Sequence, residues 1–371
     1  MFKQVLLAFF AASLSVYGVS DISKIDRNFA VEKFDDANVV YRDALKAPFV
    51  LEGFPWREDG KPLRRIPDSI KPKDINGGVY ALASHTAGGV IRFRTDSDIV
   101  VLRASIKNRN QNLGHMPSTG ASGFDLFADG NTYVKTVNPT HYLTEIPEPL
   151  VQKLYKGEKV MRDYSLYLPL YNGLNSIEIG TSPDAKFELA TPHKIKKPIV
   201  FYGSSITQGA CASRPSNCHA ALLCRAVDAP MINLGFSGSA KGEKKMAELI
   251  AGLDMSAFVY DYDYNAPNAE HLLKTHEPFF KVIRAAHPDL PIIMISRFYN
   301  ASDARAAAVR KTYENAVAEG DKKVWFIDGR DLVREVDPSL ITVDGCHPND
   351  LGFYFIYKNA LPALKAALGE K

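Results

Sequence analysis

The fold is decided by the stretch Pro198-Ile-Val-Phe-Tyr-Gly-Ser-Ser-Ile-Thr-Gln-Gly209. Its first half is a short apolar run, partly β-branched, which predicts a buried parallel strand. From Gly203 the sequence changes to glycine, serine and threonine, and a helix-like segment follows. Such a turn presents a small hydroxyl at the carboxyl edge of a sheet, where backbone N–H groups favour developing negative charge. Ser204 or Ser205 is therefore a candidate nucleophile.

After this stretch, segments with strand character alternate with segments of helical character. Strands are predicted at residues 199–202, 231–234, 258–262, 292–295 and 324–327, and helices at 217–227, 244–251, 278–286, 304–318 and 351–368. Five strands with intervening helices predict a three-layer α/β domain around a mostly parallel sheet. Active sites in such sheets lie at the carboxyl ends of the strands.

The preceding part of the chain, from about residue 25 to 190, is predicted to be all-β. Apolar and polar residues alternate in 90–95 and 175–179, as in half-buried strands. Further strands are predicted at 79–83, 99–102, 123–127 and 164–168. Many short strands separated by turn residues indicate a β-sandwich or jelly roll. A polar segment bounded by prolines, Thr191–Pro198, is the predicted linker, so we expect a β-domain at 21–193 and an α/β domain at 194–371.

The N-terminus has the features of a secretory signal. Lys3 precedes a short apolar run at 5–16, and the small residues Gly18 and Ser20 offer a cleavage site. We therefore expect residues 1–20 to be removed and the mature protein to be soluble and secreted or periplasmic. The net charge is only +3 over 371 residues, which argues against nucleic acid or a membrane surface as a partner.

A second chemical signal lies between the last predicted strand and the C-terminal helix, in Val343-Asp-Gly-Cys-His-Pro348. Asp344 and His347 are three residues apart in a loop. The carboxylate can hold one ring nitrogen while the other faces a hydroxyl, which is the arrangement of a general base and the group that orients it.

Two further segments follow the second and third predicted strands. Asn233-Leu-Gly-Phe-Ser-Gly238 ends in a glycine whose backbone N–H is available, and Asp261-Tyr-Asp-Tyr-Asn265 ends in a side-chain amide. Together with the N–H of Ser205 these groups would supply three donors to an oxyanion. Asp261 and Asp263 form a pair of carboxylates near Asn265, for which we expect a structural role.

In this combination the second half of the chain, roughly 195–370, resembles the SGNH (GDSL-type) hydrolases. The four blocks of that superfamily match Gly203-Ser-Ser205, Gly238, Asn265 and Asp344-Gly-Cys-His347, in order. The resemblance implies a flavodoxin-like three-layer fold, with Ser205 as nucleophile, His347 as base, Asp344 as its partner, and an oxyanion hole made by Ser205, Gly238 and Asn265. The family usually has aspartate before the nucleophile, where this chain has Ser204.

The first half also resembles a family domain. Gly123-Phe-Asp-Leu-Phe127 is similar to the Gly-x-Asp-Leu-Tyr signature of the β-sandwich that precedes the catalytic domain in bacterial SGNH proteins, with Phe127 in place of tyrosine. Related exported enzymes are carbohydrate acetylesterases, so the resemblance implies a serine esterase that removes acetyl groups from an oligosaccharide or polysaccharide, without a metal or organic cofactor. A lipase or thioesterase for longer acyl chains, and a degenerate carbohydrate-binding protein, remain alternatives.

Several residues near these blocks are weaker candidates. Arg214 follows the nucleophile turn and is a candidate substrate contact, and His115 lies in a long polar loop at 107–118 that could approach a ligand. Four cysteines in an exported protein allow up to two disulfides. Because Cys211 and Cys346 flank the candidate catalytic residues, we expect these two to pair.

Overall fold

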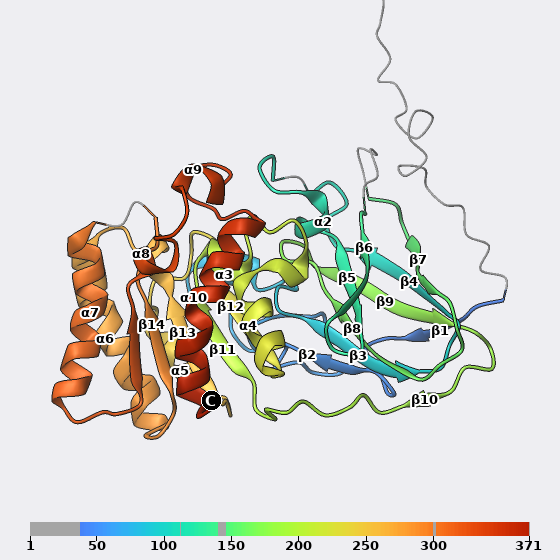
Figure 1. Cartoon of the computed structure of the whole chain (residues 1–371), viewed down its shortest axis with the longest axis horizontal. Coiled ribbons are helices and arrows are strands. Elements are labelled where there is room, and N and C mark those ends of the chain that lie inside the picture. The colour runs from blue at the N-terminus through green and yellow to red at the C-terminus, as the bar shows by residue number, and fades with distance from the viewer. Residues whose placement is uncertain (1–37, 112, 140–145, 300–301, 371) are drawn as a thin grey trace, which may run out of the picture. The chain divides into compact units, whose positions relative to one another are not determined.

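The computed structural model of the chain describes residues 38–111, 113–139, 146–299 and 302–370 (Figure 1). The predicted signal at 1–20 lies outside these residues. Contacts group Asp36–Lys371 into one compact unit. Within the described ranges, no helix combines the length and the apolar character that crossing a membrane requires.

The first part of the described chain is a β-sandwich. One antiparallel sheet has the order β1-β9-β4-β7, and the other has the order β10-β3-β8-β5-β6 with β2 paired to β3. The strands are β1 (Val40–Asp43), β2 (Val50–Glu52), β3 (Val90–Thr95), β4 (Ile99–Ile106), β5 (Phe124–Ala128), β6 (Thr132–Val137), β7 (Leu150–Lys156), β8 (Arg162–Tyr167), β9 (Leu174–Thr181) and β10 (Phe187–Glu188). Phe93 of β3 and Leu102 of β4 belong to one buried core, which confirms the predicted sandwich.

The second part is built on a parallel sheet with the order β12-β11-β13-β14-β15. Its strands are β11 (Ile199–Gly203), β12 (Met231–Gly235), β13 (Ala257–Asp261), β14 (Ile292–Ile295) and β15 (Val324–Ile327). Its α-helices are α3 (Ser205–Gln208), α4 (His219–Val227), α5 (Lys244–Ala251), α6 (Ala269–Ala286), α7 (Asp303–Ala318), α8 (Gly329–Leu332), α9 (Pro338–Ile341) and α10 (Asp350–Leu368), and two 3₁₀ helices are η3 (Pro215–Asn217) and η4 (Tyr262–Asn265).

Helices cover both faces of this sheet, so the predicted three-layer α/β architecture is confirmed (Figure 1). On β11, Ile199 and Phe201 belong to the core that contains the buried side chains of α4 and α10. Val200 and Tyr202 belong to the core on the other side, with residues of α5, α6 and α7. All five residues of β11 are buried, which explains why its sequence is a continuous apolar run.

Two element predictions differ from the structure. Residues 79–83, predicted as a strand, lie largely in helix α1 (Gly77–Leu82), because the Asn76 side chain caps this helix by accepting from the N–H of Val79. Helix α6 begins at Ala269 rather than at Pro278. Asn268 caps its first turn, and the helix continues through Pro278, which lacks only its own N–H donor.

The strand order positions the functional site. β11 pairs with β12 on one side and β13 on the other, with Gly203 opposite both Gly235 and Asp261. The chain leaves the carboxyl ends of these three neighbouring strands toward the serine turn, the Gly238 turn and Asn265. In open α/β sheets, ligands bind in the crevice at such an edge.

Candidate active site

Ser205 occupies the first position of the short helix α3, directly after β11. The Ser204 side chain caps this helix by accepting from the N–H of Ile206 at 3.2 Å, and Gly209 ends it with a φ of 117°. Ser204 therefore has a structural task, and the Ser205 hydroxyl is the one that faces a partner. The Ser205 Oγ lies 2.9 Å from His347 Nε2, although the residue is only 6% exposed.

The turn around Ser205 needs glycine at two positions because other groups approach the backbone closely. A Cβ atom on Gly203 would lie 1.7 Å from Asp261 Oδ1, and one on Gly235 would lie 2.2 Å from the backbone nitrogen of Gln208. Both separations are far below van der Waals contact, so a side chain at Gly235 would displace α3 and one at Gly203 would displace the Asp261 carboxylate. Gly235 lets the backbone of α3 pack directly against the end of β12, and Gly203 leaves room for the Asp261 and Thr207 side chains beside the end of β11.

The loop between α9 and α10 carries His347, which faces the Ser205 hydroxyl, and Asp344. Asp344 Oδ2 lies 2.7 Å from His347 Nδ1, and its Oδ1 accepts from the backbone N–H groups of Cys346 at 3.0 Å and His347 at 2.7 Å. The loop is closed by a hydrogen bond from the N–H of Val343 to the carbonyl of His347. Asp344 thus fixes both the backbone and the ring of the histidine.

The electrostatics of this loop favour an ionised carboxylate. Burial acts to raise the pKa of Asp344. The hydrogen bonds from the backbone and ring of His347 and from the Cys346 backbone outweigh burial and lower this pKa to about 2. The N–H of Cys211 donates to the carbonyl of Pro348 at 2.8 Å, so the loop is also bonded to the segment that follows Ser205. A carboxylate, an imidazole and a hydroxyl are thereby aligned for proton transfer.

Gly238 and Asn265 lie on adjoining segments beside Ser205. Gly238 has a φ of 64°, a conformation that favours glycine, and the space where its side chain would be is open. The Asn265 side chain donates to the carbonyl of Phe236 at 2.9 Å, and Phe236 itself is held by a hydrogen bond from its N–H to the carbonyl of Gly203. The structure therefore brings together all the blocks that the sequence analysis selected.

The sequence analysis missed the contribution of the β-sandwich part to this arrangement. The Tyr171 hydroxyl donates to the carbonyl of Ser205 at 3.1 Å, and the buried Gln208 side chain bridges the carbonyl of Leu170 and the N–H of Ser237. Arg65 is 0% exposed and donates to the carbonyls of His85, Leu82, Asn233 and Gly235. Through these contacts the first half of the chain holds the turns on both sides of Ser205.

His115, which the sequence analysis considered as a possible ligand contact, lies beside His347. Its ring centroid lies 5.3 Å from that of His347, and one ligand atom each of His115, Cys211 and His347 lie within 4.8 Å of one another. Two imidazoles and a thiol are ligand types that bind zinc. Both ring nitrogens of His347 already face Ser205 and Asp344, so this group is part of the serine–histidine arrangement.

The expected Cys211–Cys346 disulfide is not formed, because all four cysteines are free thiols in the structure. Cys211 is buried, and burial raises the pKa of its thiol to about 12, so it is held as a neutral side chain. Arg214 stacks on the Tyr133 ring of β6, 4.4 Å from its centroid. Within the described residues it has no recorded hydrogen bond to Ser205 or His347, and its contact with substrate remains a prediction.

The two aspartates beside Asn265 have structural partners, as expected. The Asp263 carboxylate accepts from Arg305 Nε and from the N–H of Arg297, both at 2.8 Å. Asp261 accepts from the Thr207 hydroxyl beneath the nucleophile turn, and burial raises its pKa to about 7. Neither carboxylate is arranged as an acid–base pair around an open cleft.

Comparison with known proteins follows the two parts of the chain. A model of the GDSL-like lipase/acylhydrolase family matches residues 196–364, and a model of the N-terminus of SGNH-hydrolase-type esterases, GxDLY, matches residues 39–187. The comparison with curated proteins gives no significant match.

Solved structures with the same arrangement include a protein described as a GDSL-like lipase from Bacteroides ovatus. It is 30% identical, with a TM-score of 0.75 over 90% of this chain and 99% of that one. A salicylyl-acyltransferase from a tetracycline biosynthetic pathway is 20% identical, with a TM-score of 0.74 over 90% and 98% of the two chains. An acetyl xylan esterase from the rumen bacterium Butyrivibrio proteoclasticus is 14% identical, with a TM-score of 0.57 over 90% and 99%.

Proposed function

Since the chain belongs to the GDSL-like lipase/acylhydrolase family and is an SGNH-type esterase, we propose that it removes small acyl groups, acetyl above all, from an oligosaccharide or polysaccharide. The observation that carries the proposal is the hydrogen-bonded series Ser205–His347–Asp344, with separations of 2.9 and 2.7 Å.

The chemistry follows from the positions of these three groups. His347 Nε2 takes the proton of the Ser205 hydroxyl as the oxygen attacks the ester carbonyl, and Asp344 stabilises the imidazolium that forms. His347 then donates the proton to the departing sugar oxygen. A water molecule, activated by the same histidine, attacks the acyl-enzyme and releases the carboxylic acid.

The tetrahedral intermediate carries a negative charge on the former carbonyl oxygen. The backbone N–H groups of Ser205 and Gly238 and the side-chain amide of Asn265 stabilise this charge. A carboxamide nitrogen has two hydrogens, so Asn265 can keep its hydrogen bond to Phe236 while the second N–H serves the oxyanion. These donors are held by the fold before substrate arrives, which is what makes such a site effective.

The proposal of a glycan substrate is supported by the similarity of the fold to that of carbohydrate esterases. Besides the acetyl xylan esterase above, the structure resembles a family two carbohydrate esterase from Cellvibrio japonicus, 13% identical with a TM-score of 0.58. The arrangement of an antiparallel β part before the catalytic part is thus shared with enzymes named for acting on carbohydrates. A secretory signal at 1–20, which would export the enzyme to such substrates, is part of the proposal.

The test is acetate release from a panel of acetylated glycans, with p-nitrophenyl acetate and longer-chain p-nitrophenyl esters alongside. Ser205→Ala is expected to abolish turnover. Ser204→Ala is the matched control, because it removes a neighbouring hydroxyl that only caps α3 and should cost about 1 kcal/mol of stability rather than activity.

The outcomes separate the candidate functions. Preference for acetylated glycans supports the proposal, and preference for long acyl chains would replace it with a lipase or thioesterase. Turnover that survives Ser205→Ala would refute the assigned nucleophile. Absence of turnover, combined with thermal stabilisation by glycans, would identify a carbohydrate-binding protein.

A further inference from the structure

Arg297 lies beside the proposed active site and is held rigidly. It follows β14 by two residues and thus stands at the same sheet edge as Ser205 and Asn265. Its backbone N–H donates to Asp263, its Nε donates to the carbonyl of Tyr299 at 2.7 Å, and its guanidinium carbon lies 4.6 Å from the centroid of the Tyr264 ring. These contacts fix the side chain but leave both terminal nitrogens without a partner among the described residues.

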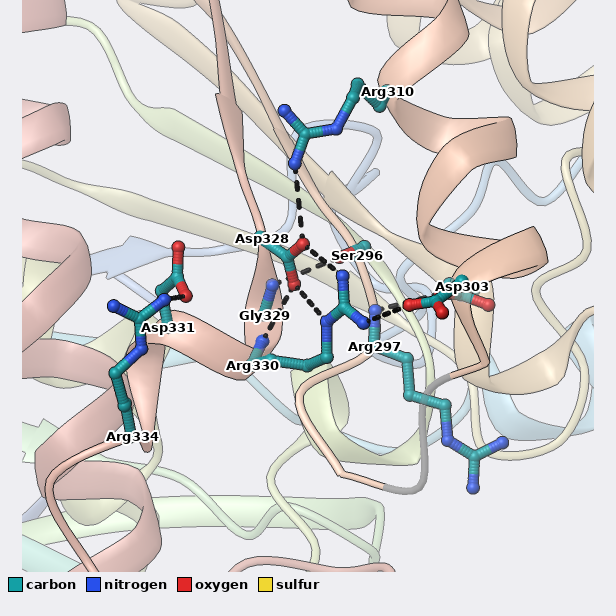
Figure 2. A network of polar contacts seen from close by, with 10 residues as sticks. Ser296, Arg297, Asp303, Arg310, Asp328, Gly329, Arg330, Asp331 and Arg334 are labelled. Atoms are coloured by element: carbon teal, nitrogen blue, oxygen red, sulfur yellow. Dashed lines mark hydrogen bonds and ion pairs between the residues drawn. The ribbon is translucent and has the colours of Figure 1, made fainter.

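The neighbouring arginines differ from Arg297 in this respect. Each of them has an ion pair. Arg310 pairs with Asp328, Arg330 pairs with both Asp328 and Asp303, and Arg334 pairs with Asp331. Figure 2 shows the Arg297 side chain pointing away from this network. Among the described residues no carboxylate lies within ion-pair distance of Arg297, although the residue is half-buried. Its charge is therefore placed at the sheet edge without a counter-ion among the residues that the structure describes.

Several contacts place Arg297 next to the loop that carries His347. Tyr264, on which it stacks, directly precedes Asn265 and accepts from the N–H of Tyr299 at 3.0 Å. A Cβ atom on Gly345 would lie 3.9 Å from the Tyr299 ring. Burial raises the pKa of the Cys346 thiol, while the charge of Arg297 opposes that increase, as expected of a near neighbour. Arg297 thus lies next to Asn265 and the Asp344–His347 loop.

We propose that Arg297 is an anion subsite that binds a carboxylate of the substrate, so that the preferred glycan carries a uronic acid close to the acylated sugar. The inference rests on the proposed function. A guanidinium presents parallel N–H groups that match a carboxylate in a bidentate pair. Because Tyr264 and Tyr299 already hold the side chain, little conformational freedom is lost when the anion binds.

The first experiment measures competition against p-nitrophenyl acetate hydrolysis by D-glucuronate, D-glucose and sulfate at equal ionic strength. For the wild type we expect D-glucuronate to inhibit at concentrations roughly tenfold lower than D-glucose, in line with one charge-assisted pair. Arg297→Gln should abolish this difference and Arg297→Lys should retain part of it. Arg310→Gln, which removes an arginine already paired with Asp328, should preserve it.

Equal inhibition of the wild type by D-glucuronate and D-glucose would overturn the inference, as would a preference that persists in Arg297→Gln. Sulfate inhibiting as strongly as D-glucuronate would overturn the assignment to a uronic acid.

The second experiment compares an acetylated oligosaccharide that carries a uronic acid with the same compound after reduction of its carboxyl group. The wild type should show the lower KM for the acidic form, and Arg297→Gln should bring the two KM values together. Equal KM values in the wild type would count against the subsite. If neither compound is deacetylated while p-nitrophenyl acetate is cleaved, the proposed function fails, and the competition experiment still decides the role of Arg297.

Discussion

The sharpest test of the oxyanion hole is Asn265→Ala. The substitution removes the side-chain donor while leaving Ser205, His347 and Asp344 in place. Loss of one such donor typically costs about 2.7–4 kcal/mol of transition-state stabilisation. At about 1.36 kcal/mol per factor of ten, kcat for acetyl esters should fall roughly 100- to 1,000-fold. KM should change little, because the charge that Asn265 stabilises exists only after the hydroxyl has attacked.

The structure also predicts a small effect on folding. Asn265→Ala removes the hydrogen bond to the Phe236 carbonyl, but that oxygen still accepts from the N–H groups of Ser239 at 3.0 Å and Ala240 at 3.1 Å. No acceptor is left unsatisfied, so the loss should be about 1 kcal/mol of unfolding free energy or less. The fall in kcat therefore cannot come from unfolding.

A matched control stands three residues away. Asn268 caps α6 by accepting from the N–H of His271 at 2.8 Å, and Asn268→Ala should cost about 1 kcal/mol of stability without lowering kcat. Steady-state hydrolysis of p-nitrophenyl acetate and urea unfolding of both variants decide the matter. If kcat of Asn265→Ala stays within threefold of that of Asn268→Ala, the amide is not an oxyanion donor and the reasoning is wrong.

Three further predictions concern other parts of the site. Added Zn²⁺ should inhibit hydrolysis if it displaces the Ser205 hydroxyl from His347 Nε2 and the proton from the Cys211 thiol, and so bridges these two residues and His115. His115→Ala should then need more Zn²⁺ for half-inhibition and EDTA should restore activity, and equal inhibition of both proteins would exclude the bridge. Burial raises the pKa of Asp261 to about 7, so above pH 4 the folded protein keeps a proton on this carboxyl that the unfolded chain has already released. The free energy of unfolding should therefore fall as the pH rises from about 4 to 7. Thermal unfolding of Asp261→Asn, followed over the same pH range, should lack that part of the fall. Arg65→Met removes the buried guanidinium that donates to the carbonyls of Leu82, Asn233 and Gly235, and it should lower the urea unfolding free energy by about 3 kcal/mol or more. A loss below about 1 kcal/mol would contradict the role described.

Much of the site was predictable because its groups are fixed by local rules. A buried strand followed by a glycine–serine turn places Ser205 at a sheet edge, and parallel strands bring the segments that carry Gly238 and Asn265 to the same edge. Asp344 and His347 are three residues apart, so a single loop supplies both. The predicted sandwich and parallel sheet follow in the same way from residue periodicity within each segment.

What could not be predicted depends on contacts between distant residues. Arg65 donates to the carbonyls of Asn233 and Gly235, which lie 168 and 170 positions further along the chain. No local sequence pattern predicts a buried arginine whose hydrogen bonds go to main-chain oxygens. The Cys211–Cys346 prediction failed because proximity to the same site in sequence does not imply a bond. Residues 79–83 were misassigned because a short apolar run fits a strand as well as a helix, and the cap at Asn76 decided between them.

These distant contacts bear on how the two halves of the chain together build the proposed active site. The turn that carries Ser205 is held by the first half of the chain at two points. The Tyr171 hydroxyl donates to the carbonyl of Ser205, and the carbonyl of Leu170 accepts from the side chain of Gln208. The Gly238 turn depends on it as well, since Arg65 holds the end of β12 at Gly235. An oxyanion hole acts only if its donors are held in place before the charge develops. The β-sandwich part is therefore a component of the scaffold of the proposed active site, whatever it contributes to substrate binding.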